Sequence, residues 1–349
     1  LGLKHRRELT VSDASSELGG EVARFHTTSE PDSRFRGNPT QKSNQCGTVL
    51  HLRARPTVRR PIRSQGKPQQ WLAAPGGRDV DSAVRRSALE RNNVVVSGRP
   101  DGRTIVFAHG YGCSQEAWRL VAPRFVDDFR VVLFDHVGAG GADVSAYDRG
   151  RHDSLHGYAD DVLQILAELD ADDVVFVGHS VSGMIGVLAA NREPSRFAQL
   201  VLVGPSPRYI DDGEYVGGFA PSQMNDILDA IDTDYIGWSS EFAPLIMGNS
   251  SQPELGSELT ASFCRVDPAI ARHFARVTFL SDNRRDLADV TVPTHVIQCS
   301  DDIIAPTEVG RFVHDAIPGS TFAQLRTTGH IPNLSGADEL ATEIRRVLS

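Results

Sequence analysis

The sequence predicts an α/β fold with a mostly parallel sheet, and two observations support this prediction. From Leu89 onward, short apolar runs alternate with amphipathic segments, the pattern of repeated strand–helix–strand units. Several of the runs are continuous stretches of Val, Ile, Leu and Phe, as expected for strands covered by helices on both faces. The segments with this strand pattern are 93–97, 104–108, 130–134, 174–177, 199–203, 294–298 and 321–325.

The amphipathic segments between these runs predict the helices that cover the sheet. They are residues 115–121, 157–169, 181–191, 307–316 and 337–348. From about residue 209 to residue 286 no strand pattern appears, and helical patterns recur at 222–231, 235–247, 254–264 and 268–279. We therefore expect one domain over residues 89–349 that carries an inserted four-helix cap at about 209–286.

The first part of the chain differs in composition from this domain. Residues 1–88 contain 16 Lys and Arg against 8 Asp and Glu, whereas residues 89–349 contain 20 against 37. The basic part is rich in Arg, Ser, Pro and Gly and has no sustained apolar period, so it cannot bury enough surface to offset chain entropy. We expect a disordered basic arm or a non-native upstream extension, since the chain begins with Leu1 and its first methionine is Met184.

The composition also limits the classes of function. The basic arm lacks interleaved aromatic residues and an amphipathic face, which argues against nucleic-acid and membrane binding. No apolar run reaches the roughly 18 residues that cross a bilayer, and the first residues given lack the apolar stretch of a secretory signal. The four cysteines are scattered and show no metal-binding spacing. We expect a cytoplasmic protein with reduced thiols, no metal and no cofactor.

The stretch "DDVVFVGHSVSGMIGVLAA", residues 172–190, runs from a strand pattern through a Gly-His-Ser turn into a helix pattern. A Gly-x-Ser motif alone also fits an ordinary crossover in which serine caps the helix. Between a strand and a helix, however, such a turn presents the Ser180 hydroxyl at the carboxyl edge of the sheet. Ser182 stands where the usual Gly-x-Ser-x-Gly motif has its second glycine, and Gly183 follows it. Ser180 is therefore the candidate nucleophile.

A serine nucleophile needs a base, and the base needs a partner that fixes its tautomer. In this fold the expected order is serine, acid, histidine, with both partners after later strands. The stretch "VIQCSDDIIAP" supplies Asp301 and Asp302, and "RTTGHIPNLS" supplies His330. We favour Asp302 over Asp301 because it adjoins two apolar isoleucines. The alternative for His330 is a loop histidine that donates to a carbonyl group.

Two backbone groups are candidates for the oxyanion hole, which stabilises the charge of a tetrahedral intermediate. The stretch "FAHGYGCS" follows the 104–108 strand, and its glycines let the backbone turn inward. We expect the N–H groups of Tyr111 and Val181 to form this hole. Asp135 also ends a strand, but it precedes the serine turn in sequence, so we interpret it as structural.

From about Leu89 to Ser349 the chain resembles α/β-hydrolases. More narrowly, it is similar to the family that unites RsbQ-type stress-response hydrolases of bacteria with the karrikin and strigolactone receptors of plants. The matching motifs are "GHSVSGMIG", "GPSPRYI", "YIGWSSEFAPL", "FCRVDPAIARHFA", "FLSDNRRDL", "DDIIAP" and "GHIPNLS". The resemblance implies a V-shaped cap over an apolar pocket, and the α/β-hydrolase fold with helices on both faces of the sheet.

The resemblance also implies roles for individual residues. It assigns Ser180, Asp302 and His330 to a catalytic triad. It places four aromatic residues in the wall of the substrate pocket: Tyr111, Trp238, Phe242 and Phe279. The alternative for these aromatic residues is the core of the cap.

The function implied by the resemblance is a serine hydrolase for a small apolar ester, lactone or butenolide-like ligand that serves signalling or a stress response with a regulatory protein partner. One alternative is a metabolic carboxylesterase or lactonase without a protein partner. Another is a cofactor-free haloperoxidase-like enzyme, which would share the triad. Dehalogenases and epoxide hydrolases of this fold use an aspartate nucleophile, so Ser180 argues against them.

Overall fold

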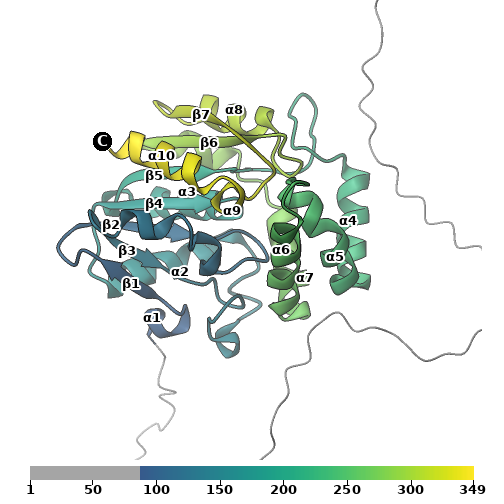
Figure 1. The fold of residues 1–349 in the computed structure, drawn as a ribbon, viewed down its shortest axis with the longest axis horizontal. Coiled ribbons are helices and arrows are strands. Elements are labelled where there is room, and N and C mark those ends of the chain that lie inside the picture. Colours follow the sequence, from purple (N-terminus) through teal and green to yellow (C-terminus); the bar gives the residue numbers. More distant parts are fainter. Residues whose placement is uncertain (1–86) are drawn as a thin grey trace, which may run out of the picture. The chain divides into compact units, whose positions relative to one another are not determined.

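The computed structural model describes residues 87–349, so the expectations for the basic arm fall almost entirely outside the described residues. The described part is built on a seven-stranded sheet with the order β1-β3-β2-β4-β5-β6-β7 (Figure 1). All seven segments with a strand pattern form strands, in the predicted order along the chain. Their bounds are β1 Val95–Gly98, β2 Arg103–Ala108, β3 Phe129–Leu133, β4 Val174–His179, β5 Phe197–Val203, β6 Thr294–Ser300 and β7 Thr321–Thr328.

The sheet is parallel except at one edge, where β1 pairs with β3 in antiparallel register. The central strand β4 lies between β2 and β5, and every residue in it is buried. Because parallel strands end at the same edge of a sheet, the loops after β2, β4, β5, β6 and β7 meet there. That edge is where ligands bind in open α/β sheets.

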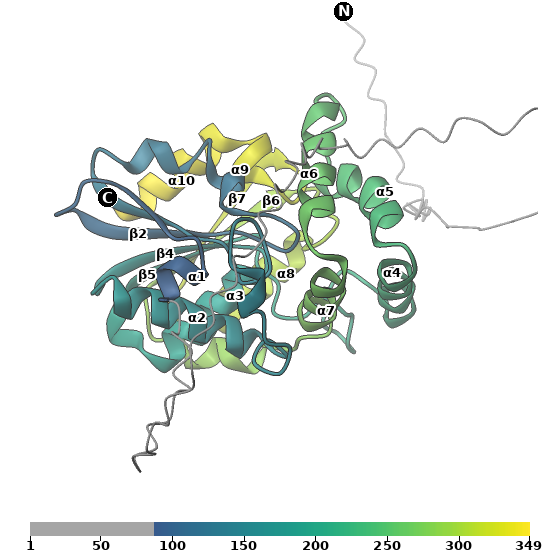
Figure 2. The same ribbon diagram turned by 90° about the horizontal axis from the view of Figure 1, so that it is seen from below.

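Helices cover both faces of the sheet, as Figure 2 shows. One face is covered by α2 (Leu155–Glu168), α3 (Val181–Arg192) and α8 (Thr307–Ala316), which share a core cluster with the strands. The other face is covered by α10 (Ala337–Leu348) and by the short 3-10 turns after β2. With apolar cover on both sides, the strands consist of continuous apolar runs, which explains their composition.

Four helices lie between β5 and β6, and they pack together at the carboxyl end of the strands (Figure 1). Asp234 and Asp267 cap the N-termini of the second and fourth of these helices. The four helices form an apolar cluster of their own, which also includes side chains from the loops after β6 and β7. Their bounds are α4 Pro221–Thr233, α5 Tyr235–Met247, α6 Pro253–Arg265 and α7 Pro268–Phe279.

One predicted helix is wrong, at residues 115–121. The structure has two 3-10 turns there instead, η1 Gln115–Trp118 and η2 Ala122–Phe125. Tertiary contacts override the local helix pattern at this point: the backbone N–H of Gln115 donates to Asp135, and Trp118 is fully buried against Phe107. The sequence pattern did not predict two short helices, α1 Ala88–Arg91 and α9 Pro332–Ser335.

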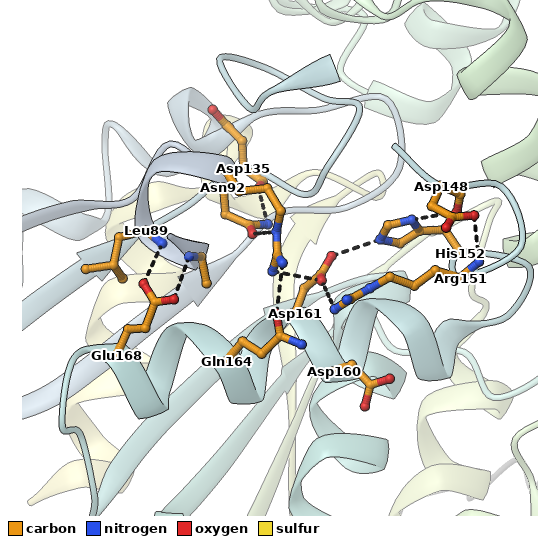
Figure 3. A network of polar contacts seen from close by, with 12 residues as sticks. Leu89, Asn92, Asp135, Asp148, Arg151, His152, Asp160, Asp161, Gln164 and Glu168 are labelled. Carbon is orange, nitrogen blue, oxygen red and sulfur yellow. Dashed lines mark hydrogen bonds and ion pairs between the residues drawn. The ribbon is translucent and has the colours of Figure 1, made fainter. Parts of the chain in front are cut away.

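A polar network fixes α1 to α2 (Figure 3). Glu168 accepts hydrogen bonds from the first two backbone N–H groups of α1, at 2.7 and 3.2 Å. The buried Asp161 accepts from His152 Nε2 at 2.9 Å and pairs with Arg91 at 2.9 Å. Because a buried carboxylate is stable only with such partners, these contacts anchor the beginning of the described chain on the sheet.

Candidate active site

Ser180 lies between β4 and α3 in a strained turn. Its φ of 58° and ψ of −126° belong to a region that residues with a side chain seldom adopt. Gly178 makes the tight approach possible, because a Cβ at Gly178 would lie 2.4 Å from the carbonyl oxygen of Ser182. The turn is held by the Ser180 N–H, which donates to the Val203 carbonyl at 2.8 Å. The side chain of Ser180 is therefore presented at the carboxyl edge of the sheet.

The structure brings Ser180, His330 and Asp302 into one hydrogen-bonded chain. The Ser180 hydroxyl lies 2.8 Å from His330 Nε2, and His330 Nδ1 lies 2.7 Å from Asp302 Oδ2. The carboxylate can only accept, so we assign the proton to Nδ1 and the lone pair to Nε2. In this tautomer Nε2 can take the proton of the serine. All three residues are buried.

Asp302, and not Asp301, contacts the histidine. Asp302 Oδ1 accepts from the backbone N–H groups of Ile304 and Ala305 at 2.9 and 3.0 Å, which leaves Oδ2 for His330. Asp301 is exposed and has a φ of 49°, so it forms the turn that places its neighbour.

His179 supports the loop that carries His330. Its Nε2–H donates to the backbone carbonyl of His330 at 2.7 Å. Burial and, to a smaller extent, the neighbouring His330 together lower the pKa of His179 to about 3. His179 is therefore neutral at physiological pH and acts as a fixed donor. The N–H of His330 donates to the Ile246 carbonyl at 2.9 Å, which ties the same loop to α5.

The loop after β2 passes directly beside Ser180, as the proposed oxyanion hole requires. A Cβ at Gly110 would lie 3.1 Å from the Ser180 Cβ. His109 Nδ1 donates to the Gly110 carbonyl at 2.9 Å, because its Nε2 accepts from the backbone N–H of His136. Val181 is the first residue of α3, so its N–H has no acceptor within the helix. The roles of the Tyr111 and Val181 N–H groups remain a prediction.

Asp135 has the surroundings of a structural carboxylate, which agrees with its interpretation from sequence. It accepts from the backbone and side chain of Gln115 at 2.8 and 3.1 Å, from Asn93 at 2.8 Å and from the Gly141 N–H at 2.8 Å. Its backbone carbonyl accepts from Asn92 at 3.0 Å (Figure 3). These bonds join the loops after β2 and β3.

A small cavity of ≈ 30 Å³ lies over Ser180 and His330, with room for only a few water molecules. Three of the four predicted aromatic residues line it, namely Tyr111, Trp238 and Phe279. Phe242 does not line it: its ring stacks on Trp238 with the centroids 5.2 Å apart. Seven wall residues were not anticipated from sequence: His179, Tyr209, Ile246, Phe263, Thr278, Ile304 and Ile331. For Tyr209 a signal existed, because it closely follows the end of a central strand.

Within residues 87–349, no group of three or more His, Cys, Asp or Glu side chains is arranged to hold a metal ion. None of the helices in this range is both long and apolar enough to span a membrane.

Comparison with known proteins identifies the family. Residues 105–343 match the model of the alpha/beta hydrolase family. The chain belongs to the α/β-hydrolase family. It is 38% identical over 250 residues to a karrikin insensitive 2 receptor of Petunia hybrida, covering 71% of this chain and 92% of the receptor. It is also 38% identical over 265 residues to a strigolactone esterase of Arabidopsis thaliana, covering 76% and 98%.

A solved hydrolase from Oleispira antarctica shares the architecture, with a TM-score of 0.73, 36% identity and coverage of 75% of this chain and 96% of that one. The similar proteins include a named esterase and a named hydrolase, so this α/β-hydrolase is an enzyme with hydrolytic activity. The predicted fold class and the predicted resemblance are both confirmed.

The stability of this α/β-hydrolase should fall steeply below pH 6.5. Burial lowers the pKa values of three histidines near the site, His109, His136 and His179. The folded state keeps these rings neutral, whereas in the unfolded chain they take up protons below about pH 6.5. The free energy of unfolding should therefore fall as the pH drops below 6.5, by up to about 1.4 kcal/mol per pH unit for each ring.

Urea unfolding at pH 7.5, 6.5 and 5.5 measures this slope. His136→Gln should remove about a third of it. His156→Gln, on the exposed side of α2, should leave it unchanged. A free energy of unfolding that does not change from pH 7.5 to 5.5 would contradict the prediction.

Proposed function

We propose that the protein is a serine hydrolase that cleaves a small, mostly apolar ester or lactone with Ser180, His330 and Asp302. The observation that supports this most strongly is the continuous hydrogen-bonded chain of these three side chains at the floor of an apolar cavity. A serine, a base and an orienting carboxylate in this geometry are the parts that acyl transfer requires.

The reaction follows from the positions of the protons. His330 Nε2 takes the proton of the Ser180 hydroxyl as Oγ bonds to the carbonyl carbon. The resulting oxyanion is stabilised by the N–H groups of Tyr111 and Val181. The alcohol oxygen then leaves with the proton from His330, and an acyl-serine remains. A water molecule, deprotonated by His330, attacks the acyl carbon and releases the acid and the free serine. Asp302 stabilises the imidazolium in both halves.

The cavity walls favour a neutral, compact substrate. Within residues 87–349, no Lys, Arg, Asp or Glu side chain lines the cavity over Ser180. An anionic group would therefore be desolvated without a counter-charge. The volume of ≈ 30 Å³ also means that a ligand of several heavy atoms must displace cap side chains. Binding and cap rearrangement are therefore coupled.

We propose further that hydrolysis serves a signalling role with a regulatory protein partner. The relatives named above include a karrikin receptor and a strigolactone esterase. Two contacts support coupling between the chemistry and the cap: the His330 N–H donates to Ile246 in α5, and a Cβ at Gly329 would lie 1.9 Å from the Met247 carbonyl oxygen. A movement of the loop that carries His330 therefore moves the end of α5 as well.

The signalling role predicts slow turnover together with a strong response to ligand. Metabolic hydrolases typically turn over at about 1–10³ per second, whereas a signalling state must last long enough for a partner to bind it. We expect turnover below this range on small esters and butenolides, and a ligand-dependent shift in melting temperature.

Steady-state kinetics and thermal denaturation with the same panel of compounds test this. Ser180→Ala, which cannot form the acyl-enzyme, should still show a shift with ligand. Binding to the native state alone stabilises by about 2.7 kcal/mol at a hundredfold excess over Kd. Rapid turnover without any shift would instead identify a metabolic esterase.

A further inference from the structure

Three buried polar groups in the cavity wall have no hydrogen-bond partner within the part of the chain that the structure describes. They are the Tyr209 hydroxyl, the Thr278 hydroxyl and the Trp238 indole N–H. Tyr209 and Thr278 are each only 1% exposed. A buried hydroxyl without a partner destabilises the folded state, so such groups are few in folded proteins. Three of them around one small cavity indicate that the missing partner is a ligand.

Thr278 differs from four other serine and threonine residues of the cap helices. A helical serine or threonine commonly donates to the carbonyl four residues earlier, which satisfies its hydroxyl. Four cap residues do so: Ser239, Ser240, Ser257 and Thr260. The Thr278 hydroxyl makes no such bond, although it lies in α7 with helical backbone on both sides. Because Thr278 lines the cavity, a molecule bound in the cavity is the nearest candidate for the missing partner of its hydroxyl.

Tyr209 differs in the same way from the other tyrosines of the cap cluster. The hydroxyls of Tyr111 and Tyr235 donate to the backbone carbonyls of Ala271 and Phe263, at 3.0 and 3.1 Å. The Tyr209 hydroxyl lies beside the Ser180 side chain but forms no hydrogen bond of normal geometry. Burial raises the pKa of Tyr209, so its hydroxyl keeps its proton and remains a donor.

The chemistry of these groups restricts what they can bind. The indole N–H can only donate a hydrogen bond and both hydroxyls can donate one, so a ligand with acceptor oxygens can satisfy all three groups. We infer that Tyr209 and Thr278 form a polar subsite for a second oxygen of the substrate, a carbonyl or ether oxygen outside the scissile ester. The inference rests on the proposed function, and it defines the substrate class as neutral esters or lactones with an additional acceptor oxygen. The Trp238 N–H can donate a further hydrogen bond to the same acceptor oxygen of the substrate.

The subsite makes the enzyme prefer substrates that carry the second oxygen. A substrate with the second oxygen satisfies the buried hydroxyls, whereas its hydrocarbon analogue leaves them unpaired. A difference of about 1–3 kcal/mol corresponds to roughly 5- to 150-fold in kcat/KM. Tyr209→Phe and Thr278→Val remove the hydroxyl and nearly conserve the shape, so they should remove this preference without closing the cavity.

The experiment compares p-nitrophenyl alkanoates with analogues in which one methylene is replaced by an ether oxygen, at each of three successive positions of the acyl chain. For at least one position, Tyr209→Phe and Thr278→Val should lower kcat/KM for the ether ester by about tenfold or more. The same variants should lower kcat/KM for the alkanoate by less, so that the ether-to-alkyl ratio of kcat/KM falls relative to wild type. Because each comparison is between variant and wild type, the intrinsic reactivity of each ester cancels. Thr260→Val, which removes a hydroxyl satisfied inside α6, is the matched control and should leave the ether-to-alkyl ratio unchanged.

Melting temperatures provide a second measurement. Removing an unsatisfied buried hydroxyl should leave the melting temperature of Tyr209→Phe and Thr278→Val unchanged or higher, whereas a structural hydroxyl would lower it. The inference is overturned if the ether-to-alkyl ratio is unchanged at all three positions, or if both ester series lose activity equally. If wild type still hydrolyses the alkanoates and Ser180→Ala does not, the subsite inference fails but the proposed function stands. If wild type hydrolyses neither series, the proposed function itself fails.

Discussion

Ser180→Ala is expected to lower kcat on a p-nitrophenyl ester by about 10⁶-fold and to leave the fold intact. The hydroxyl is the group that would bond to the acyl carbon, and no other hydroxyl in the described residues lies against His330 Nε2. Removal of a triad serine in a serine protease causes a loss of that size. Alanine keeps the Cβ that serine already places in the turn, and no cap hydrogen bond to α3 is lost, since the serine side chain makes none. Steady-state kinetics with matched circular dichroism spectra measure the effect.

Ser182→Ala is the control within the same turn. The Ser182 hydroxyl donates to the His109 carbonyl at 2.6 Å and lies 2.7 Å from His136 Nε2, so it supports the loop and does not face His330. Its loss should cost about 1–3 kcal/mol of stability and far less activity than the loss of Ser180. If Ser180→Ala keeps most of the activity, or if Ser182→Ala is the more damaging change, Ser180 is not the nucleophile.

Asp302→Asn is expected to lower turnover by about 10⁴-fold, because it reverses the tautomer of His330. In wild type, Asp302 Oδ1 accepts from two backbone N–H groups and Oδ2 accepts from His330 Nδ1. Asparagine can keep its oxygen on the backbone donors only by turning its NH₂ group toward Nδ1. His330 must then accept at Nδ1 and carry its proton on Nε2, where it can no longer take the proton of Ser180. A pH profile and kcat for the variant test this.

Asp301→Asn provides the matched comparison one residue away. Asp301 is exposed and sits in a left-handed turn, a conformation that asparagine also tolerates well. We expect little change in kcat and in melting temperature. If the two effects are exchanged, the orienting carboxylate is Asp301 and the arrangement of the turn in solution differs from that described above.

The layout of the fold and the order of the candidate catalytic residues followed from sequence alone. Continuous apolar runs separated by helix patterns require a parallel sheet with two covered faces, and such a sheet brings the loops after its strands to one edge. Ser180, Asp302 and His330 follow the ends of β4, β6 and β7. Their approach to one another is therefore a consequence of topology, which a periodic pattern encodes.

The tertiary structure alone decided which side chains line the cavity and which hydrogen bonds remain unmade. The sequence pattern could not separate Phe242, which stacks on Trp238 outside the cavity, from Phe279, which lines it, because both lie on apolar faces of amphipathic helices. It also could not show that the hydroxyls of Tyr209 and Thr278 lack partners, while Thr260 satisfies its own within α6. Whether a polar group is satisfied depends on distances of a few tenths of an ångström between elements far apart in the chain, and those distances arise only when the helices of the cap pack.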